Sequence, residues 1–219
     1  MVKDGIWYGL GLLAVTAVIY FTTHNLKLCA PPLLLMLFFL WFFRDPYRTI
    51  PKTPGAIVSP ADGVVTEAEW VETTAGSKLR VSIFLNVFDV HVNRSPISGT
   101  VKLVEYREGG FMNAMNPESG LNNEQTMIQI AGGGYEVSMK QIAGLLARRI
   151  VCNLKEGDQV ERGQRIGMIK FGSRCDVLMP AEANLKVKTG SRVKGGSTVL
   201  AVLPEFFVQT KSAAAAVVA

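Results

Sequence analysis

The sequence has little histidine and little cysteine. Its 219 residues include two histidines, His24 and His91, and three cysteines, Cys29, Cys152 and Cys175. The cysteines are odd in number and lack metal-site spacing, so they predict thiols in a reducing compartment. His24 lies between two apolar runs, which leaves His91 as the one imidazole for acid–base chemistry in the rest of the chain. A zinc site that needs several histidines is excluded, and we expect no metal.

Charge is absent from two stretches near the N-terminus. Residues 5–23 carry no charged side chain, and as a helix rising about 1.5 Å per residue they would reach roughly 28 Å, close to a bilayer core. After the polar break at residues 24–27, residues 28–43 are again uncharged. This pattern predicts an N-terminal hydrophobic helical hairpin, within a first domain of residues 1–48, that either spans the membrane or dips into it from one side.

The basic residues that flank this hairpin indicate its orientation. Lys3 precedes it, and Arg44, Arg48 and Lys52 follow it, whereas only Lys27 lies at its tip. Because basic flanks stay on the cytoplasmic side, we expect the rest of the chain to lie on the cytoplasmic face of the cell membrane. The formal net charge of +5 suits an anionic membrane surface, and without a nucleic-acid-binding motif we expect no nucleic-acid partner.

The second domain, residues 49–219, has the pattern of a β protein. Runs rich in Val and Ile alternate with glycine turns about every 8–12 residues. An internal repeat aligns residues 160–169 with residues 193–202, 33 positions apart throughout, and each copy predicts a strand, a tight glycine turn and a strand. We therefore expect a mainly β, compact barrel-sandwich-hybrid-like domain with quasi-repeated hairpins. A turn or two of helix is expected near residues 143–150, and a frayed tail at residues 213–219.

A serine follows two glycines at the turn of the second copy, in Gly195-Gly196-Ser197-Thr198. Glycine permits unusual backbone angles and leaves its carbonyl unshielded, so the Ser197 hydroxyl could attack the Gly196 carbonyl carbon. Such an N→O acyl shift gives an ester, and elimination then hydrolysis would turn the serine into a pyruvoyl group and ammonia. The same residues also suit an ordinary turn. Gln164 takes the serine's place in the first copy, so one structural slot holds a nucleophile only once.

Two further positions could serve acid–base chemistry. Asp62 lies in Ser59-Pro60-Ala61-Asp62-Gly63, a pattern that also matches a plain β-turn. Asp89 and His91 follow an apolar strand, and in an extended segment they would lie on one face, with Asp89 placed to orient the imidazole. A lone histidine at such a place could equally be a satisfied structural group.

These residues belong to a series of motifs in a fixed order. The motifs are Phe43-Arg44-Asp45-Pro46, Ser59 to Gly63, Phe88 to Pro96, Asn122-Asn123-Glu124, Ala147–Val151 with Glu156-Gly157-Asp158, Phe171 to Arg174, and Gly196-Ser197-Thr198. In this order they resemble the phosphatidylserine decarboxylase family, in its short bacterial and archaeal form. The resemblance covers Arg44 to Leu203 and the N-terminal hairpin.

The resemblance implies a proenzyme that cuts itself between Gly196 and Ser197. The products would be chains 1–196 and 197–219, which stay together as a heterodimer, and a higher oligomer is also open. The second chain would begin with a pyruvoyl group made from Ser197, the covalent cofactor of the family.

The family activates this serine with an aspartate and a histidine. Asp62 occupies the position of the aspartate. Larger members have two histidines three residues apart, whereas here Arg94 occupies the second position. Both histidine roles therefore fall to His91, with Asp89 orienting it.

The implied reaction converts phosphatidylserine into phosphatidylethanolamine and CO2, with archaetidylserine as an open alternative substrate. The pyruvoyl carbonyl would form a Schiff base with the serine amine and accept the electrons that CO2 leaves behind, and His91 would protonate the carbon. Candidate partners of the lipid phosphate or carboxylate are Arg94, Asn123, Glu124 and Arg174. Phe111, Met112 and Met115 could form an apolar edge at the membrane.

Two other classes share part of the pattern. The run Glu156 to Gly167 resembles hairpins of lipoyl-type sandwich domains, but the expected carrier turn, Phe171 to Arg174, has no lysine to modify. A non-enzymatic membrane adaptor with such a domain therefore stays open, and it would remain one uncut chain. A zinc peptidase of the sandwich-hybrid type shares the same run, and one domain histidine cannot supply its ligands.

Overall fold

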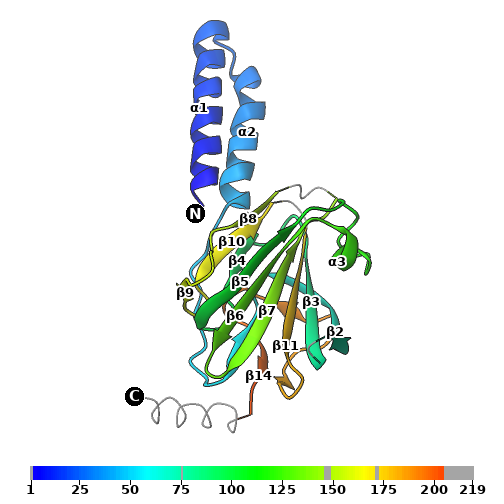
Figure 1. Cartoon of the computed structure of the whole chain (residues 1–219). Coiled ribbons are helices and arrows are strands. Elements are labelled where there is room, and N and C mark those ends of the chain that lie inside the picture. Colours follow the sequence, from blue (N-terminus) through cyan, green and yellow to red (C-terminus); the bar gives the residue numbers. More distant parts are fainter. Residues whose placement is uncertain (1, 75, 146–148, 171–172, 205–219) are drawn as a thin grey trace. The chain divides into compact units, whose positions relative to one another are not determined.

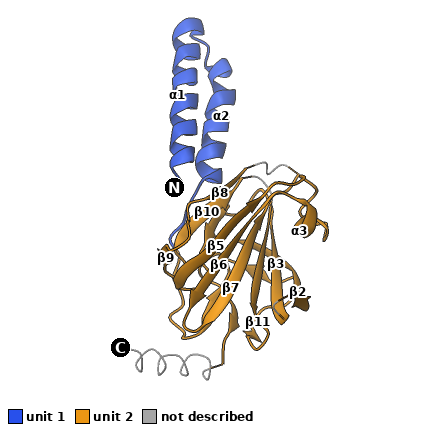
Figure 2. Ribbon diagram, viewed as in Figure 1, with its two compact units in different colours: residues 1–47 blue, residues 48–219 orange. Residues whose placement is uncertain are grey.

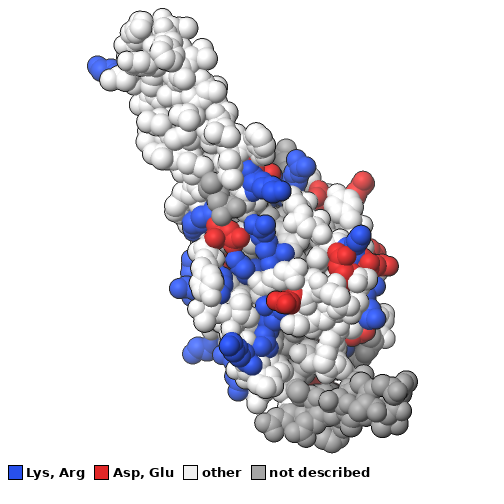
Figure 3. Space-filling model, turned by 90° about the vertical axis from the view of Figure 1, so that its left-hand side faces the viewer, with Lys and Arg blue, Asp and Glu red and all other residues white. Residues whose placement is uncertain are grey.

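The computed structural model describes residues 2–74, 76–145, 149–170 and 173–204 (Figure 1). The chain divides into two compact units, Met1–Tyr47 and Arg48–Ala219 (Figure 2). The expected tail at residues 213–219 lies outside the described residues. On the face shown in Figure 3, charged side chains gather on the second unit and almost none lie on the first.

The first unit is the expected hairpin of two apolar helices, α1 (Lys3–Thr23) and α2 (Leu26–Phe42). Glycines let the helices approach closely, since a Cβ on Gly5 would lie 2.6 Å from the Cβ of Phe43, and one on Gly9 would lie 2.9 Å from a methyl of Leu40. Tyr8 stacks on Phe43 with ring centroids 5.6 Å apart. By length and composition α1 could cross a membrane, and only 11% of its most apolar window is buried within the chain. The 17-residue α2 is shorter.

The second unit is mainly β, as expected, and is built from three sheets. A curled sheet of eight strands has the order β13-β2-β3-β11-β7-β6-β5-β9, and two three-stranded sheets have the orders β1-β14-β12 and β4-β10-β8. The bounds are β1 (Ala56–Val58), β2 (Gly63–Thr73), β3 (Gly76–Leu85), β4 (Val92–Arg94), β5 (Gly99–Arg107), β6 (Gln125–Gly132), β7 (Tyr135–Ile142), β8 (Ile150–Cys152), β9 (Gln159–Val160), β10 (Arg165–Ile169), β11 (Ser173–Pro180), β12 (Asn184–Leu185), β13 (Arg192–Val193) and β14 (Val199–Val202).

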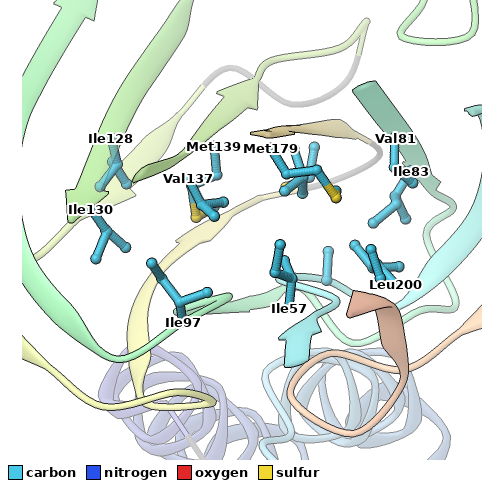
Figure 4. Close-up of a cluster of buried hydrophobic side chains, with 14 of the residues drawn as sticks. Ile57, Val81, Ile83, Ile97, Ile128, Ile130, Val137, Met139, Met179 and Leu200 are labelled. Atoms are coloured by element: carbon cyan, nitrogen blue, oxygen red, sulfur yellow. The ribbon is translucent and has the colours of Figure 1, made fainter. Parts of the chain in front are cut away.

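The core lies on the concave side of the curled sheet (Figure 4). Alternate residues of β3, from Leu79 to Leu85, are completely buried, and so are Val137 and Met139 of β7. They pack against Ile57 of β1 and Leu200 of β14, so the small sheets close one side of the core. This alternation is the period of two that a half-buried strand requires.

One expectation of helix differs from the structure. No helix occurs in the described part of residues 143–150, where β8 begins at Ile150, and residues 146–148 lie outside the described residues. The one helix found in the described part of the second unit is α3 (Ser119–Asn122), a single turn ahead of β6.

The predicted repeat extends to the whole second unit. Strands β1, β2, β12, β13 and β14 pair with one another as β4, β5, β8, β9 and β10 do. The eight-stranded sheet reads the same from both edges, since β13 and β2 at one edge match β9 and β5 at the other. A sequence signal for this symmetry is Ser-Pro-x-x-Gly, which occurs at Ser59 and again 36 positions later at Ser95. The quasi-symmetric arrangement predicted from the hairpin repeat is therefore present.

Candidate active site

The turn that joins β13 to β14, residues 194–198, carries the predicted nucleophile. The Lys194 carbonyl accepts hydrogen bonds from the amides of Ser197 (3.1 Å) and Thr198 (3.0 Å). The Gly196 amide donates to the Ser59 carbonyl at 2.7 Å, and the Ser59 amide donates to the Thr198 carbonyl at 2.8 Å. These bonds hold the backbone on both sides of the Gly196–Ser197 peptide. We name residues 194–198 the serine turn.

Gly196 could not be replaced by another residue without strain. Its φ of 76° lies in the left-handed region, which favours glycine. A Cβ here would lie 2.9 Å from Cδ of Arg94 and 3.2 Å from Cδ1 of Ile50. Arg94, a predicted site residue, therefore packs directly on the serine turn, and its Nη1 donates to the Gly163 carbonyl at 2.9 Å.

The corresponding turn of the other half of the domain, residues 161–164, is one residue shorter. Ser95 is the counterpart of Ser59. Its carbonyl accepts a hydrogen bond from the Gly163 amide, and its own amide donates to the Gln164 carbonyl, both at 2.8 Å. The side-chain oxygen of Gln164 accepts the Glu161 amide, a role that Oγ1 of Thr198 fills in the serine turn by accepting the Lys194 amide. Thr198, and not Ser197, is therefore the structural match of Gln164.

This one-residue difference corrects the predicted offset. The two halves align 33 positions apart up to Gly163 and Gly196, and 34 apart afterwards, because Arg165 pairs with Arg94 whereas Val199 pairs with Val58. Ser197 and Gln164 do not share one slot, since Ser197 is an additional residue. Consequently the Gln164 carbonyl accepts the Ser95 amide, whereas in the serine turn the Ser59 amide is accepted by the carbonyl of Thr198, the residue after Ser197.

Asp62, for which the family resemblance implies a role as an activating carboxylate, lies against the serine turn. Its Oδ1 accepts the Gly195 amide at 2.8 Å. In the other half the same bond is made by Oγ of Ser98, which accepts the Arg162 amide at 2.9 Å. Asp62 thus keeps a structural role that a serine fills elsewhere, and it adds a negative charge beside the Gly196–Ser197 peptide.

Sequence reasoning missed the residue that balances this charge. Nη2 of Arg48 lies 2.9 Å from Oδ1 and 2.8 Å from Oδ2 of Asp62, and both side chains are largely buried. Arg48 was interpreted only as a basic flank of the membrane segment. The Arg-Asp-Pro-x-Arg motif could have drawn attention to it, but nothing local indicates its partner 14 residues away.

His91 and Asp89 lie in the loop between β3 and β4. His91 is completely buried, and its Nδ1 lies 2.9 Å from the main-chain oxygen of Asp89. The expected extended geometry is wrong for Asp89, because residues 86–89 form a turn in which the Asp89 amide donates to the Asn86 carbonyl. The Asp89 carboxylate therefore accepts the Asn86 amide at 2.9 Å and pairs with Arg192 of β13 at 2.5 Å. That ion pair joins the His91 loop to the hairpin that carries Ser197.

Arg174 lies within an ion-pair network of the eight-stranded sheet. Its guanidinium pairs with Asp176 (2.6 Å) and Glu67 (2.9 Å) and donates to Oγ of Ser82 (2.8 Å). Burial opposes the charge, yet hydrogen bonds and the charges of Asp176 and Glu67 raise the pKa of Arg174. With these partners, Arg174 is engaged by the protein itself, which leaves its predicted role toward the lipid without support from its contacts.

Asn123 and Glu124 hold the loop of residues 109–124 in place. The side-chain oxygen of Asn123 accepts a hydrogen bond from the backbone amide of Met112, and its side-chain nitrogen donates to the carbonyls of Met112 and Ala143. The Glu124 amide donates to the Gly110 carbonyl at 3.0 Å. Both residues lie at the end of the sheet where β3 and β7 finish, because Gln125 pairs with Ile142.

The cysteines and possible metal ligands suggest no competing site. Burial raises the pKa of the Cys152 and Cys175 thiols, which disfavours the reactive thiolate. Among the described residues, no group of three or more His, Cys, Asp or Glu side chains is arranged to hold a metal ion.

Comparisons with known proteins agree with one another. The profile of a family described as "Phosphatidylserine decarboxylase" matches residues 35–201. A "Phosphatidylserine decarboxylase proenzyme" of Solibacter usitatus (strain Ellin6076) is 49% identical over 201 residues, covering 92% of this chain and 96% of the relative. Relatives with the same name are 45% identical over 199 residues in Oleidesulfovibrio alaskensis (90% and 91% covered) and 41% identical over 202 residues in Burkholderia pseudomallei strain 1106a (91% and 94% covered).

Proposed function

The chain belongs to the phosphatidylserine decarboxylase family, and on that premise we propose that it cuts itself at Gly196–Ser197 and decarboxylates phosphatidylserine through a pyruvoyl group made from Ser197. The observation that carries this proposal is the additional residue of the serine turn. The two turns of the domain are flanked by matching strands, and each has a left-handed glycine and an anchoring serine. Only the serine turn has an additional residue with no counterpart in the other turn, and that residue carries a hydroxyl group.

Self-cleavage begins with attack by Oγ of Ser197 on the carbonyl carbon of Gly196. The C–N bond breaks as the ester forms, and the amine stays on Ser197. Loss of the Ser197 α-proton and rupture of its Cβ–Oγ bond then release the Gly196 carboxylate. The dehydroalanine left at position 197 takes up water and loses ammonia, which gives the pyruvoyl end.

Asp62 is the base for the first step. Among the described residues, its Oδ1 accepts two hydrogen bonds, from Arg48 and Gly195, while Oδ2 has Arg48 alone and can still accept a proton. The fixed Gly195 amide keeps the carboxylate next to the peptide that breaks, so little reorganisation is needed.

The serine turn fits a pyruvoyl end. After the cut this group would precede Thr198, whose carbonyl and Oγ1 are tied to Ser59 and Lys194 of the larger chain. β14 of the smaller chain lies between β1 and β12 of the larger one, so the two chains would stay together as a heterodimer. The pyruvoyl carbonyl supplies the electron sink for decarboxylation, through Schiff-base chemistry with the substrate amine. His91 then delivers a proton to the substrate carbon that has lost CO2.

A lipid substrate is consistent with two features of the chain. The apolar helix α1 is long enough to cross a membrane, and we propose that it anchors the chain in the cell membrane with the second unit on the cytoplasmic side, as its basic flanks favour. Large apolar side chains on loops and on helix α3, at one end of the eight-stranded sheet, are 60–69% exposed. They are Phe88, Met115, Leu121 and Leu145. We assign this end, the apolar loop end, to contact with the lipid leaflet.

Mass spectrometry of the purified full chain tests the proposal. The wild type should give two masses, matching chains 1–196 and 197–219, with the smaller chain blocked at its N-terminus, and it should release CO2 from phosphatidylserine. Ser197→Ala should remain one uncut and inactive chain, whereas Ser191→Ala in the same hairpin should be cut and active. A wild-type protein that decarboxylates lipid at its full uncut mass would refute the mechanism. An uncut chain without activity would favour the adaptor.

A further inference from the structure

The segment that follows the helical hairpin is bound to both turns of the second unit. We name residues 48–56 the docked linker. At its start, Arg48 pairs with Asp62 beside the serine turn. Further along, Nη1 of Arg162 donates to the carbonyls of Thr53 and Ala56 at 2.9 Å each. The linker therefore has specific contacts at both ends and is not a passive tether.

Ile50 connects the two turns at the centre of the docked linker. A Cβ on Gly163 would lie 2.3 Å from Cδ1 of Ile50, and a Cβ on Gly196 would lie 3.2 Å from the same atom. Both glycines have left-handed backbones, with φ of 79° and 76°. Ile50 therefore fills the space at Gly163 and shares the space at Gly196 with Arg94, so that one side chain of the linker packs on both turns.

The Arg48–Asp62 pair belongs to the active half alone. In the other half the position of Asp62 is taken by Ser98, a neutral group that needs no cation. The Nε of Arg48 is buried and has no hydrogen-bond partner among the described residues. Leaving such a donor unpaired costs stability. The contact of Nη2 with both oxygens of Asp62 is therefore the interaction that explains why an arginine is buried here.

We infer that the docked linker completes the self-cleavage site, with Arg48 as a positioning residue that acts through Asp62. This inference rests on the proposed self-cleavage. Arg48 holds both oxygens of the carboxylate, and thereby fixes the direction in which Oδ2 can take the proton of the Ser197 hydroxyl. Because Arg48 reaches Asp62 from the docked linker, the chain should mature only after this segment has docked.

The rate of self-cleavage of the full chain, synthesised in vitro into lipid nanodiscs, tests this inference. The fraction of cut chain is followed by intact mass against time for Arg48→Met, Arg48→Lys and the control Lys52→Met, which removes an exposed cation of the same linker. We expect Arg48→Met to slow cleavage at least tenfold and Lys52→Met to leave it unchanged. Because a single nitrogen of Arg48 makes the contact, Arg48→Lys should restore much of the rate.

A comparison in the Asp62→Asn background separates positioning from folding. If Arg48 acts through Asp62, Asp62→Asn and the double variant with Arg48→Met should share one residual rate. A further loss in the double variant, or wild-type cleavage by Arg48→Met, would overturn the inference. Should Arg48→Met fail to fold, inserting Gly-Ser before Arg48 (expected to be tolerated) and after Thr49 (expected to block cleavage) gives the same decision. Equal cleavage of both insertions would refute docking, whereas an uncut, active wild type would refute the proposed function instead.

Discussion

Replacing Gly196 by alanine should slow self-cleavage about 5- to 30-fold. Gly196 has a left-handed backbone with φ of 76°, and an alanine in that region costs roughly 1–2 kcal/mol. Its new Cβ would also lie 2.9 Å from Cδ of Arg94, closer than real Cβ contacts allow. If cleavage needs the observed turn, this energy lowers the population of the competent turn by the corresponding factor.

Gly190→Ala is the matched control for this experiment. Gly190 also has a left-handed backbone, with φ of 87°, but a Cβ there would meet nothing within 4 Å, and the residue lies outside the serine turn. Both variants should have a lower unfolding temperature, by about 2–8 °C for a loss of roughly 1–2 kcal/mol in the free energy of unfolding. Only Gly196→Ala should delay self-cleavage. Intact mass against time and thermal unfolding of the uncut chain measure the two effects. Wild-type cleavage by Gly196→Ala, or an equal delay in Gly190→Ala, would refute the reasoning.

Three further outcomes follow from the contacts. The double variant Ser98→Asp/Gln164→Ser copies the residue types of the active half without the additional residue, so intact mass should show no cut ahead of position 164. A new cut there would show that these residue types are enough for self-cleavage without the additional residue. Arg174→Met should lower the free energy of unfolding by about 3–5 kcal/mol in urea, because it removes the ion-pair partner of the buried Asp176 carboxylate, whereas Glu67 keeps Arg80. Unchanged stability with a raised KM for a soluble short-chain phosphatidylserine would return Arg174 to lipid binding. Phe88→Ser/Leu121→Ser should lose activity on vesicles but keep it on the short-chain lipid, and equal losses on both would argue against leaflet contact.

Periodicity and missing charge were enough to predict the two long helices and the β character of the second unit. The uncharged residues 5–23 and 28–43 became α1 and α2, and the Val- and Ile-rich runs became strands, because burial of apolar surface determines both patterns. The turn of helix expected near residues 143–150 was wrong in its described part, where the pairing of Ile150 with Ile169 overrides local propensity.

The candidate site was predicted less completely, since its geometry depends on pairing and on contacts between distant segments. An ungapped alignment of the two hairpins cannot detect an additional residue, which becomes visible only when Val199 is seen to pair with Val58. Likewise, the alternation rule placed the Asp89 carboxylate beside the His91 ring. The turn at Asn86 redirects that carboxylate to a backbone amide and to Arg192.

The symmetry of the domain explains why a cut at one peptide need not unravel the fold. The counterpart of the serine turn shows what the scaffold requires, which is a left-handed glycine, an anchoring serine and a side-chain oxygen that accepts a turn amide. Thr198 supplies that oxygen in the active half, so the bond does not depend on Ser197, whose own amide donates only within the turn, to the Lys194 carbonyl. Converting Ser197 to another group therefore removes none of the bonds that the two halves share. We expect the cut protein to unfold in urea close to the midpoint of uncut Ser197→Ala. A free energy of unfolding lower by several kcal/mol in the cut protein would mean that the intact Gly196–Ser197 peptide bond supports the fold.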